Sequence, residues 1–296
     1  MVVELMLTLT YEFKLIPDKR QIEVIEHTLN VCRSVWNYAL RERKDWSKSR
    51  KSPINACSLI QEYIISPDVS YPNYHNQAKA LTKAKKTNDI LKSVNAQVLQ
   101  QVLRTLDRAF ADMQSKKLGF PRFKNKYRMR SYVYPQMLKD CVKGNQIKLP
   151  QIGWIKFRKS REIPNGFELK QARIVRKASG YFMMLSMQLD VSIPDVPFHG
   201  HPLGIDVGLD KFLATSDGEL VDRPRFLNRL HRKLKLLQRR LRNKQKGSHN
   251  RHKLNQKIAR LHQRISDARK DWHFKLLCRL QRPQRRTEEE YTVLVV

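Results

Sequence analysis

The sequence is poor in cysteine and has no long apolar run. Its 296 residues include four cysteines that lie far apart and form no Cys-x-x-Cys pair: Cys32, Cys57, Cys141 and Cys278. This spacing excludes the usual structural zinc site, and we expect free, buried thiols in a reducing cytoplasm. No apolar run approaches the roughly 18 residues that span a bilayer, and the N-terminus lacks the basic and apolar blocks of a secretory signal. A membrane-spanning or exported protein is therefore not indicated.

Acidic residues are also scarce. The chain has 27 Asp and Glu against 59 Lys and Arg, which gives a formal net charge of +32. So large an excess of one sign repels itself in a compact state unless a polyanion neutralises it, and nucleic acid is the first candidate. The 41% of apolar residues suffice for a real core divided among two or three domains.

The shortage of acid is most extreme near the C-terminus. Residues 223–264 contain 16 Lys or Arg and no Asp or Glu. Leucine and isoleucine recur every three or four positions there, which predicts a helical hairpin over 225–277 with a turn at 246–250. A charged helix face is ordinarily solvated and stabilised by opposite charges, but these are missing, so we expect the face to contact nucleic acid. The candidate contacts in the hairpin are Arg232, Lys233, Arg239, Arg240, Arg242, Lys244, Arg251 and Lys253.

A second basic segment spans residues 119–130. Its cations fall at every second position: Arg122, Lys124, Lys126, Arg128 and Arg130. In an extended chain they would share one face, with aromatic side chains on the other, which predicts a strand that follows a phosphate backbone. The alternative is an exposed basic edge strand, since lysine at a sheet edge also blocks aggregation.

The remaining pattern indicates an α+β protein. Residues 3–15 alternate as a half-buried strand, and residues 18–46 and 88–115 have helical spacing and should pack on each other. Residues 131–192 read as short strands with a hairpin at Ser179-Gly180. We expect the N-terminal strand to join this β region, which would make the helices an insertion.

One carboxylate stands inside an apolar strand pattern. Leu203, Ile205 and Val207 alternate with Gly204, Asp206 and Gly208, and a tight Asp217-Gly218 turn follows a second strand. We expect Asp206 to be buried, and a buried carboxylate needs either a partner or a metal. A purely structural role for a single buried aspartate is the alternative.

These segments together resemble the TnpB (OrfB) family of insertion-sequence transposon proteins, RNA-guided nucleases related to type V CRISPR effectors. The resemblance covers roughly residues 5–277 and is most specific where Gly-Phe-Pro-Arg-Phe-Lys at 119–124 is followed by Gly-Ile-Asp-Val-Gly at 204–208. It implies an α+β multidomain architecture. The implied parts are a β-barrel wedge domain (1–17 and 119–198), an inserted helical recognition domain (18–118) and a partial RNase H-like (RuvC) domain (199–296) that carries the hairpin.

The resemblance also implies chemistry. Asp206 matches the first catalytic carboxylate of the family and would be a metal ligand, most simply for Mg²⁺ in a two-metal hydrolysis of DNA. DNA and a guide RNA are the implied partners, and the bacterial cytoplasm, at the nucleoid, is the implied location. The family's second catalytic Glu, its zinc ribbon and its last Asp have no match, because the resemblance ends near Leu277 and Glu288–Glu290 lie in a polar tail.

We therefore expect a C-terminally truncated, transposon-encoded protein of the TnpB/OrfB transposase type, associated with DNA transposition and recombination. It would bind nucleic acid but be defective as an RNA-guided DNA endonuclease. Two alternatives stay open. One is an active metal-dependent endonuclease completed by another fragment, and the other is a non-enzymatic RNA-binding protein.

Overall fold

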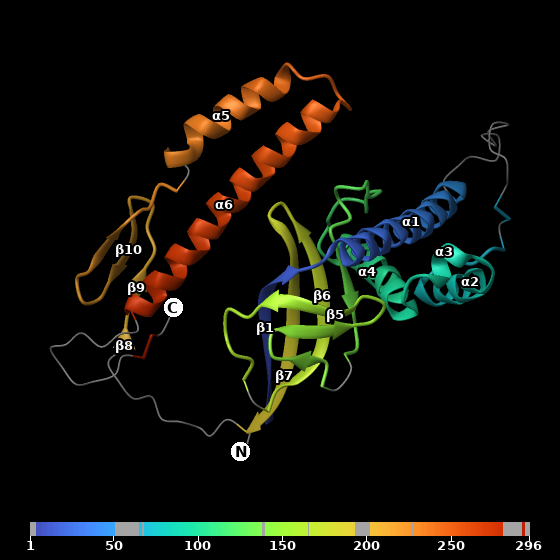
Figure 1. The fold of residues 1–296 in the computed structure, drawn as a ribbon, viewed down its shortest axis with the longest axis horizontal. Helices are drawn as coiled ribbons and strands as arrows, with labels where there is room; N and C mark the ends of the chain where they lie inside the picture. The colour runs from blue at the N-terminus through green and yellow to red at the C-terminus, as the bar shows by residue number, and fades with distance from the viewer. Residues whose placement is uncertain are drawn as a thin grey trace. The chain divides into compact units, whose positions relative to one another are not determined.

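The computed structural model shows an α+β protein with two compact units (Figure 1). The structure describes residues 4–50, 65–66, 68–137, 140–164, 166–192, 202–226, 228–280 and 292–293. Residues 5–191 form the first unit, and the described residues from 192 onward form the second. None of the described helices is long and apolar enough to cross a membrane.

The first unit is built on a curled antiparallel sheet (Figure 1). Its seven strands lie in the order β2-β6-β7-β1-β5-β4-β3. Their bounds are β1 Glu4–Ile16, β2 Ser131–Tyr134, β3 Val142–Lys143, β4 Gln146–Leu149, β5 Gly153–Arg158, β6 Glu168–Lys177 and β7 Gly180–Ser192. Because β1 lies between β7 and β5, the N-terminal strand joins the later β region, as the sequence predicts. The domain boundaries expected from the sequence stay a prediction.

The alternation of apolar residues along the strands explains which face of the sheet is buried. Met183, Leu185 and Met187 on β7 are fully buried, and the β6–β7 hairpin closes with Lys177 opposite Gly180. On β1, Phe13 and Leu15 are buried, and the Phe13 ring lies 5.2 Å from that of Phe157. Side chains two positions apart on a strand share a face, so these residues contribute to one core.

Helices are inserted between β1 and β2. They are α1 Lys19–Ser49, α2 Tyr74–Thr87, α3 Asp89–Lys92 and α4 Ala96–Ser115. A capping box starts α1, in which the Asp18 side chain accepts from the Gln21 amide and the Gln21 side chain accepts from the Asp18 amide. The apolar faces of α1 and α4 share the core with the sheet, which confirms that these helices pack on each other. The single helix expected over 88–115 is wrong, because the chain breaks at 93–95 and Asn95 caps α4.

The second unit combines small sheets with a helical hairpin. Its strands are β8 Pro202–Leu203, β9 Ile205–Asp206, β10 Lys211–Thr215, β11 Leu220–Asp222 and β12 Thr292–Val293, and its helices are α5 Asn228–Arg242 and α6 His249–Leu280. β9, β10 and β11 form an antiparallel sheet, and β12 pairs with β8 in parallel. The strand, turn and second strand expected around Asp206 are therefore present, as is the helical hairpin.

The expectation that the cysteines are free and buried is confirmed in part. Cys32 and Cys141 are buried free thiols, but Cys278 is free and exposed, which corrects the expectation of burial there. It lies on α6, whose buried positions near this end are Leu276 and Leu280. Cys57 lies outside the described residues.

Candidate nucleic-acid interface

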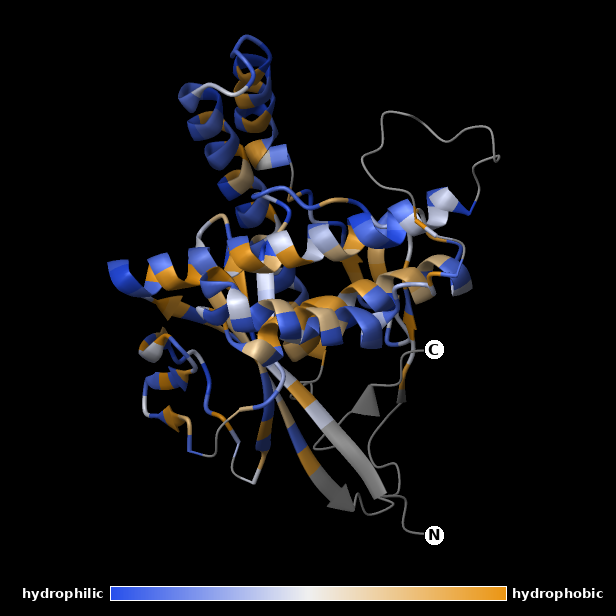
Figure 2. Cartoon of the chain, turned by 90° about the vertical axis from the view of Figure 1, so that its right-hand side faces the viewer, coloured by the Kyte–Doolittle hydropathy of each residue, from blue (hydrophilic) through white to orange (hydrophobic). Residues whose placement is uncertain are grey.

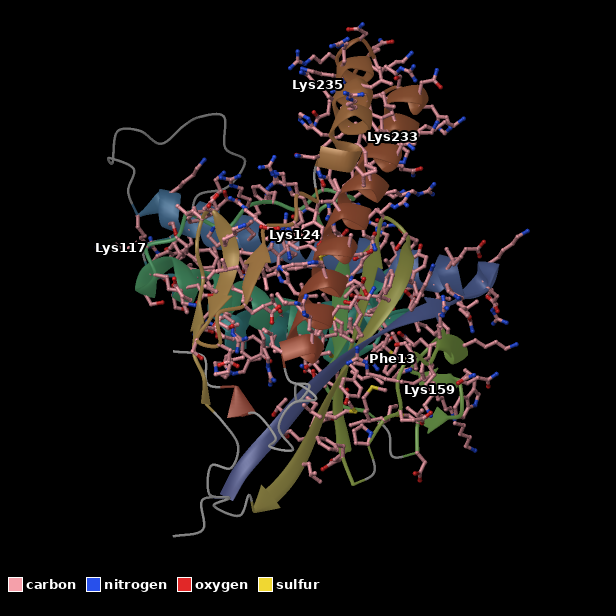
Figure 3. All side chains as sticks on the ribbon, turned by 90° about the vertical axis from the view of Figure 1, so that its left-hand side faces the viewer. Phe13, Lys117, Lys124, Lys159, Lys233 and Lys235 are labelled. Atoms are coloured by element: carbon pink, nitrogen blue, oxygen red, sulfur yellow. The ribbon has the colours of Figure 1, made fainter. Side chains whose placement is uncertain are left out.

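The hairpin is held by a narrow apolar seam. Leu234 and Leu237 of α5 are buried against Leu261 of α6, and three further apolar residues flank them: Leu230, Leu254 and Ile258. Hydrophilic residues dominate the rest of both helices (Figure 2). Side chains with nitrogen tips, Lys233 and Lys235 among them, project from the hairpin (Figure 3). A seam this narrow leaves most of each helix surface to charged residues.

The other end of α6 packs on the small sheet. Leu276 and Leu280 are buried against Leu203, Leu213 and Val221. The Trp272 ring lies edge-on to the Phe212 ring at a centroid distance of 4.8 Å, which adds an aromatic contact to the same cluster. The helix is thus anchored at one end, and its other half presents the basic surface.

A basic cleft of about 640 Å³ lies at the turn of the hairpin. Its cations are Arg240 and Lys244 at the end of α5 and Lys253 and Lys257 on α6, and each pair is four residues apart in sequence. All four side chains are exposed, and none forms an ion pair with a described residue. Positions four apart lie on one helix face, so each pair brings like charges together. The cleft can therefore receive an anionic group that would relieve this repulsion.

The other predicted hairpin cations fall into two groups. Arg232, Lys233, Arg239 and Arg242 are exposed, as a contact surface requires. Arg251 differs because its Nη1 donates to the carbonyl oxygens of Leu241 and Lys244, at 2.9 and 2.7 Å. Its guanidinium satisfies carbonyls that the end of α5 leaves open, so the structure gives Arg251 a capping role.

The strand expected over 119–130 is wrong. The segment has no regular secondary structure and turns at 126–128. Its path is set by α1, since Asn37 donates to the Lys124 carbonyl at 2.9 Å and accepts from the Lys124 amide at 2.8 Å. The Trp36 indole donates to the Arg122 carbonyl at 3.1 Å. These contacts use the backbone groups that a sheet partner would otherwise need.

The alternation of cations therefore does not make one basic face. Arg122, Lys126, Arg128 and Arg130 are exposed. Lys124 is half-buried, and its Nζ lies 3.4 Å from the centroid of the Trp36 ring, a close cation–π contact. Burial lowers the pKa of Lys124 to about 8, with a smaller opposing effect of Cys32. Cys32 lies beside this charge, yet burial raises its own pKa to about 12, so the thiol stays protonated near neutral pH.

Asp206 is exposed, so the expected burial is wrong. It ends β9 and pairs with Ala214 of β10. Gly208 follows in the turn, where an added Cβ would lie 3.3 Å from the Lys211 carbonyl oxygen, so a side chain would crowd this turn. The carboxylate therefore stands at a strand end facing solvent, which removes the burial argument for a partner or a metal.

Metal ligation has little support within the described part of the chain. No three His, Cys, Asp or Glu side chains gather there in a way that could hold an ion. Two carboxylates near Asp206 in sequence have cationic partners, since Asp222 accepts from Lys211 at 2.6 Å and Glu219 pairs with Arg279. The described donor set does not fit a two-metal centre, which needs several carboxylates around both ions.

Sequence reasoning missed several residues of these sites. Lys257 lines the basic cleft and could have been found from its spacing of four from Lys253. Tyr132 and Arg173 line a small cavity that also contains Lys124 and Trp36. No local pattern connects these four residues, because they come from β2, β6, α1 and an irregular segment.

Two family models match the chain. One, described as "Probable transposase" (OrfB of the IS605 type), matches residues 186–287, and the other, described as a helix-turn-helix domain of the same proteins, matches residues 6–52. The first match includes the small sheet and the basic hairpin. The described residues of the second contain β1 and the single long helix α1, so they do not show two helices joined by a turn.

Curated relatives agree with these matches. The chain is 29% identical over 230 residues to "Putative RNA-guided DNA endonuclease InsQ" of Escherichia coli (strain K12), which covers 77% of this chain and 52% of that protein. It is 29% identical over 276 residues to a "Putative RNA-guided DNA endonuclease" of Streptomyces pristinaespiralis, which covers 92% of this chain and 64% of that protein. The matched region thus spans between half and two thirds of the length of these relatives.

The fold and the basic hairpin, together with these matches, define a transposase-type protein of insertion sequences. The two family models and the two relatives together support a member of the TnpB (OrfB) family.

Proposed function

We propose that this chain binds nucleic acid through the basic cleft and the exposed cations of the α5–α6 hairpin. The observation that carries the proposal is the cleft of about 640 Å³, whose four cations form no ion pair with a described residue and whose lining contains no described carboxylate. Phosphate contacts of this kind supply sequence-independent affinity. The relatives are named as RNA-guided DNA endonucleases, so DNA and a guide RNA are the proposed partners, and the bacterial nucleoid is the proposed place of action.

We further infer that the second unit is a partial RNase H-like domain of the RuvC type. Support comes from the strand–turn–strand segment that carries Asp206 and from the match of residues 186–287 to the transposase model. In this assignment Asp206 would be the first metal ligand and would favour Mg²⁺, which prefers oxygen ligands. The described residues do not complete such a site, so no hydrolytic step is assigned to them.

A salt titration tests the binding proposal. If about eight hairpin cations engage a duplex, log Kd should change with log salt with a slope near 7 in magnitude, at about 0.9 per neutralised phosphate. The measurement is fluorescence anisotropy with labelled DNA and RNA between 50 and 200 mM salt. An affinity that does not depend on salt would refute the proposal.

Cleavage is tested separately. We expect the 296-residue chain to bind DNA without cutting it when Mg²⁺ is added. Cleavage that disappears in Asp206→Asn would favour the alternative of an active endonuclease, with the missing ligands supplied from outside the described residues. Binding itself should be the same in Asp206→Asn, because this carboxylate lies outside the basic cleft.

A further inference from the structure

A small polar cavity lies in the first unit. It has a volume of about 80 Å³ and is lined by side chains of α1, α4, β2 and β6 and of the 119–130 segment. Its polar lining residues include Lys124, Arg173, Tyr132, Ser131 and Gln101, and its described lining contains no Asp or Glu. The cavity therefore combines two cations with neutral donors, which is the composition of an anion site.

Lys124 is held in this cavity before any ligand binds. Two hydrogen bonds to Asn37 fix its backbone, and the contact with Trp36 at 3.4 Å fixes its ammonium group. Ordering a long lysine side chain normally opposes binding, and here that ordering is already part of the fold. The ammonium group has no ion pair with a described carboxylate, so its charge is available to a ligand.

Tyr132 supplies the second observation. It is 2% exposed, and its hydroxyl has no hydrogen-bond partner among the described residues. Burial raises the pKa of Tyr132 well above its ordinary value, with smaller effects of Tyr134, so the hydroxyl stays protonated and can donate. A buried polar group without a partner is costly and calls for an explanation, which a bound ligand would provide.

The volume restricts the ligand. Pockets for drug-sized molecules measure roughly 300–1,000 Å³, so a cavity of about 80 Å³ suits one small oxyanion better than a base or nucleoside. The face of Trp36 is also already covered by Lys124, which leaves that face unavailable for stacking a base.

We propose that this cavity binds one phosphate group of a nucleic-acid backbone, with Lys124 supplying the charge and Tyr132 a donated hydrogen bond. The inference rests on the proposed nucleic-acid binding and adds a second, structurally distinct contact to it. Arg173, which is exposed on β6, would hold the same phosphate from the solvent side.

The test compares two tyrosines. Tyr132→Phe removes the unpartnered hydroxyl, and Tyr134→Phe removes a neighbouring one that donates to the Pro150 carbonyl at 3.0 Å and lies outside the cavity lining. Affinities are measured for RNA and DNA oligonucleotides of the same length and sequence. We expect Tyr132→Phe to weaken binding about tenfold while its melting temperature stays the same or rises, because its hydroxyl makes no well-formed hydrogen bond with a described residue that could be lost. Tyr134→Phe should lower the melting temperature and leave the affinity unchanged.

A pair of lysine variants checks the charge. Lys124→Gln and Lys126→Gln remove the same charge two residues apart, but only Lys124 lines the cavity. We expect Lys124→Gln to lose more affinity than Lys126→Gln. If this difference is seen with RNA, the phosphate belongs to RNA, and if it is seen with DNA, the phosphate belongs to DNA. Wild-type affinity in Tyr132→Phe, or equal losses in the two lysine variants, would overturn the inference. Failure of the wild-type chain to bind either polymer would instead overturn the proposed function.

Discussion

Removing the charge of the hairpin cleft gives the sharpest test of the proposed interface. The variant replaces Arg240, Lys244, Lys253 and Lys257 with glutamine, which keeps helix propensity high. Each cation that neutralises a phosphate contributes about 0.9 to the salt slope on duplex DNA and about 0.7 on a single strand. Four such cations therefore contribute about 3.6 to the salt slope on duplex DNA and about 2.8 to the slope on a single strand. Between 50 and 200 mM salt, the wild type should lose about 150-fold more affinity for a duplex than the variant does.

The same variant separates a binding role from a structural one. The four cations form two like-charge pairs at a spacing of four residues, and each such pair weakens a helix by about 0.2–0.5 kcal/mol. Their removal should therefore leave the melting temperature unchanged or raise it slightly. Anisotropy across the salt range and thermal melting by circular dichroism give the two readings.

The control for total charge removes four cations elsewhere. The exposed lysines Lys79, Lys83, Lys86 and Lys148 in the first unit are replaced with glutamine, so both variants lose four charges. We expect the control to keep most of the wild-type slope, because phosphate contacts act at short range. Equal flattening of the slope in the two variants, or a wild-type slope in the cleft variant, would show that the cleft cations do not contact phosphate.

Three further predictions concern other parts of the chain. Asp107→Ala removes the 2.9 Å partner of the fully buried Arg43 and should lower the stability of the first unit by about 2 kcal/mol, seen as a fall in melting temperature. Asp112→Ala breaks only the exposed ion pair with Lys116, so it should lower the stability of the first unit by only about 0–1 kcal/mol, less than Asp107→Ala does. Because the folded-state pKa of Lys124 is lowered to about 8, the unfolded chain binds more protons between that value and the ordinary lysine pKa. The contribution of Lys124 to stability should therefore rise with pH above about 8, and Lys124→Gln should abolish that rise in pH-dependent melting. For Asp206→Asn we expect unchanged DNA affinity by anisotropy, and a large change would place this residue in the interface.

Periodicity predicted the hairpin and the sheet because each depends on a local pattern. Leucine and isoleucine recur at helical spacing along α5 and α6, and six of these residues form the seam in the structure: Leu230, Leu234, Leu237, Leu254, Ile258 and Leu261. The alternating residues of β7 likewise bury one face. In both cases the repeat length selects the element, and no distant residue has to be known.

The 119–130 segment shows where such reasoning fails. Cations at every second position are compatible with a strand, but the segment is fixed by Asn37 and Trp36, which are 87 and 86 residues away in the chain from their partners. Contacts at that separation leave no local pattern, so neither the turn nor the cavity around Lys124 could be predicted. The prediction that Asp206 is buried fails for a related reason. Burial at a strand end depends on what covers the sheet and not on the alternation of the strand.

The charge pattern of the hairpin suggests that the hairpin is more stable when nucleic acid is bound. Its seam contains few buried leucines, and its surface from 223 to 264 has cations without a single carboxylate to offset them. Evolution toward stability alone would favour acidic residues at spacings of four, since these are readily accommodated on an exposed helix. Their complete absence is explained if a polyanion supplies the missing negative charge when it binds. The hairpin would then be more stable in the complex than in the free chain, because a ligand that binds only the folded state shifts the equilibrium toward it.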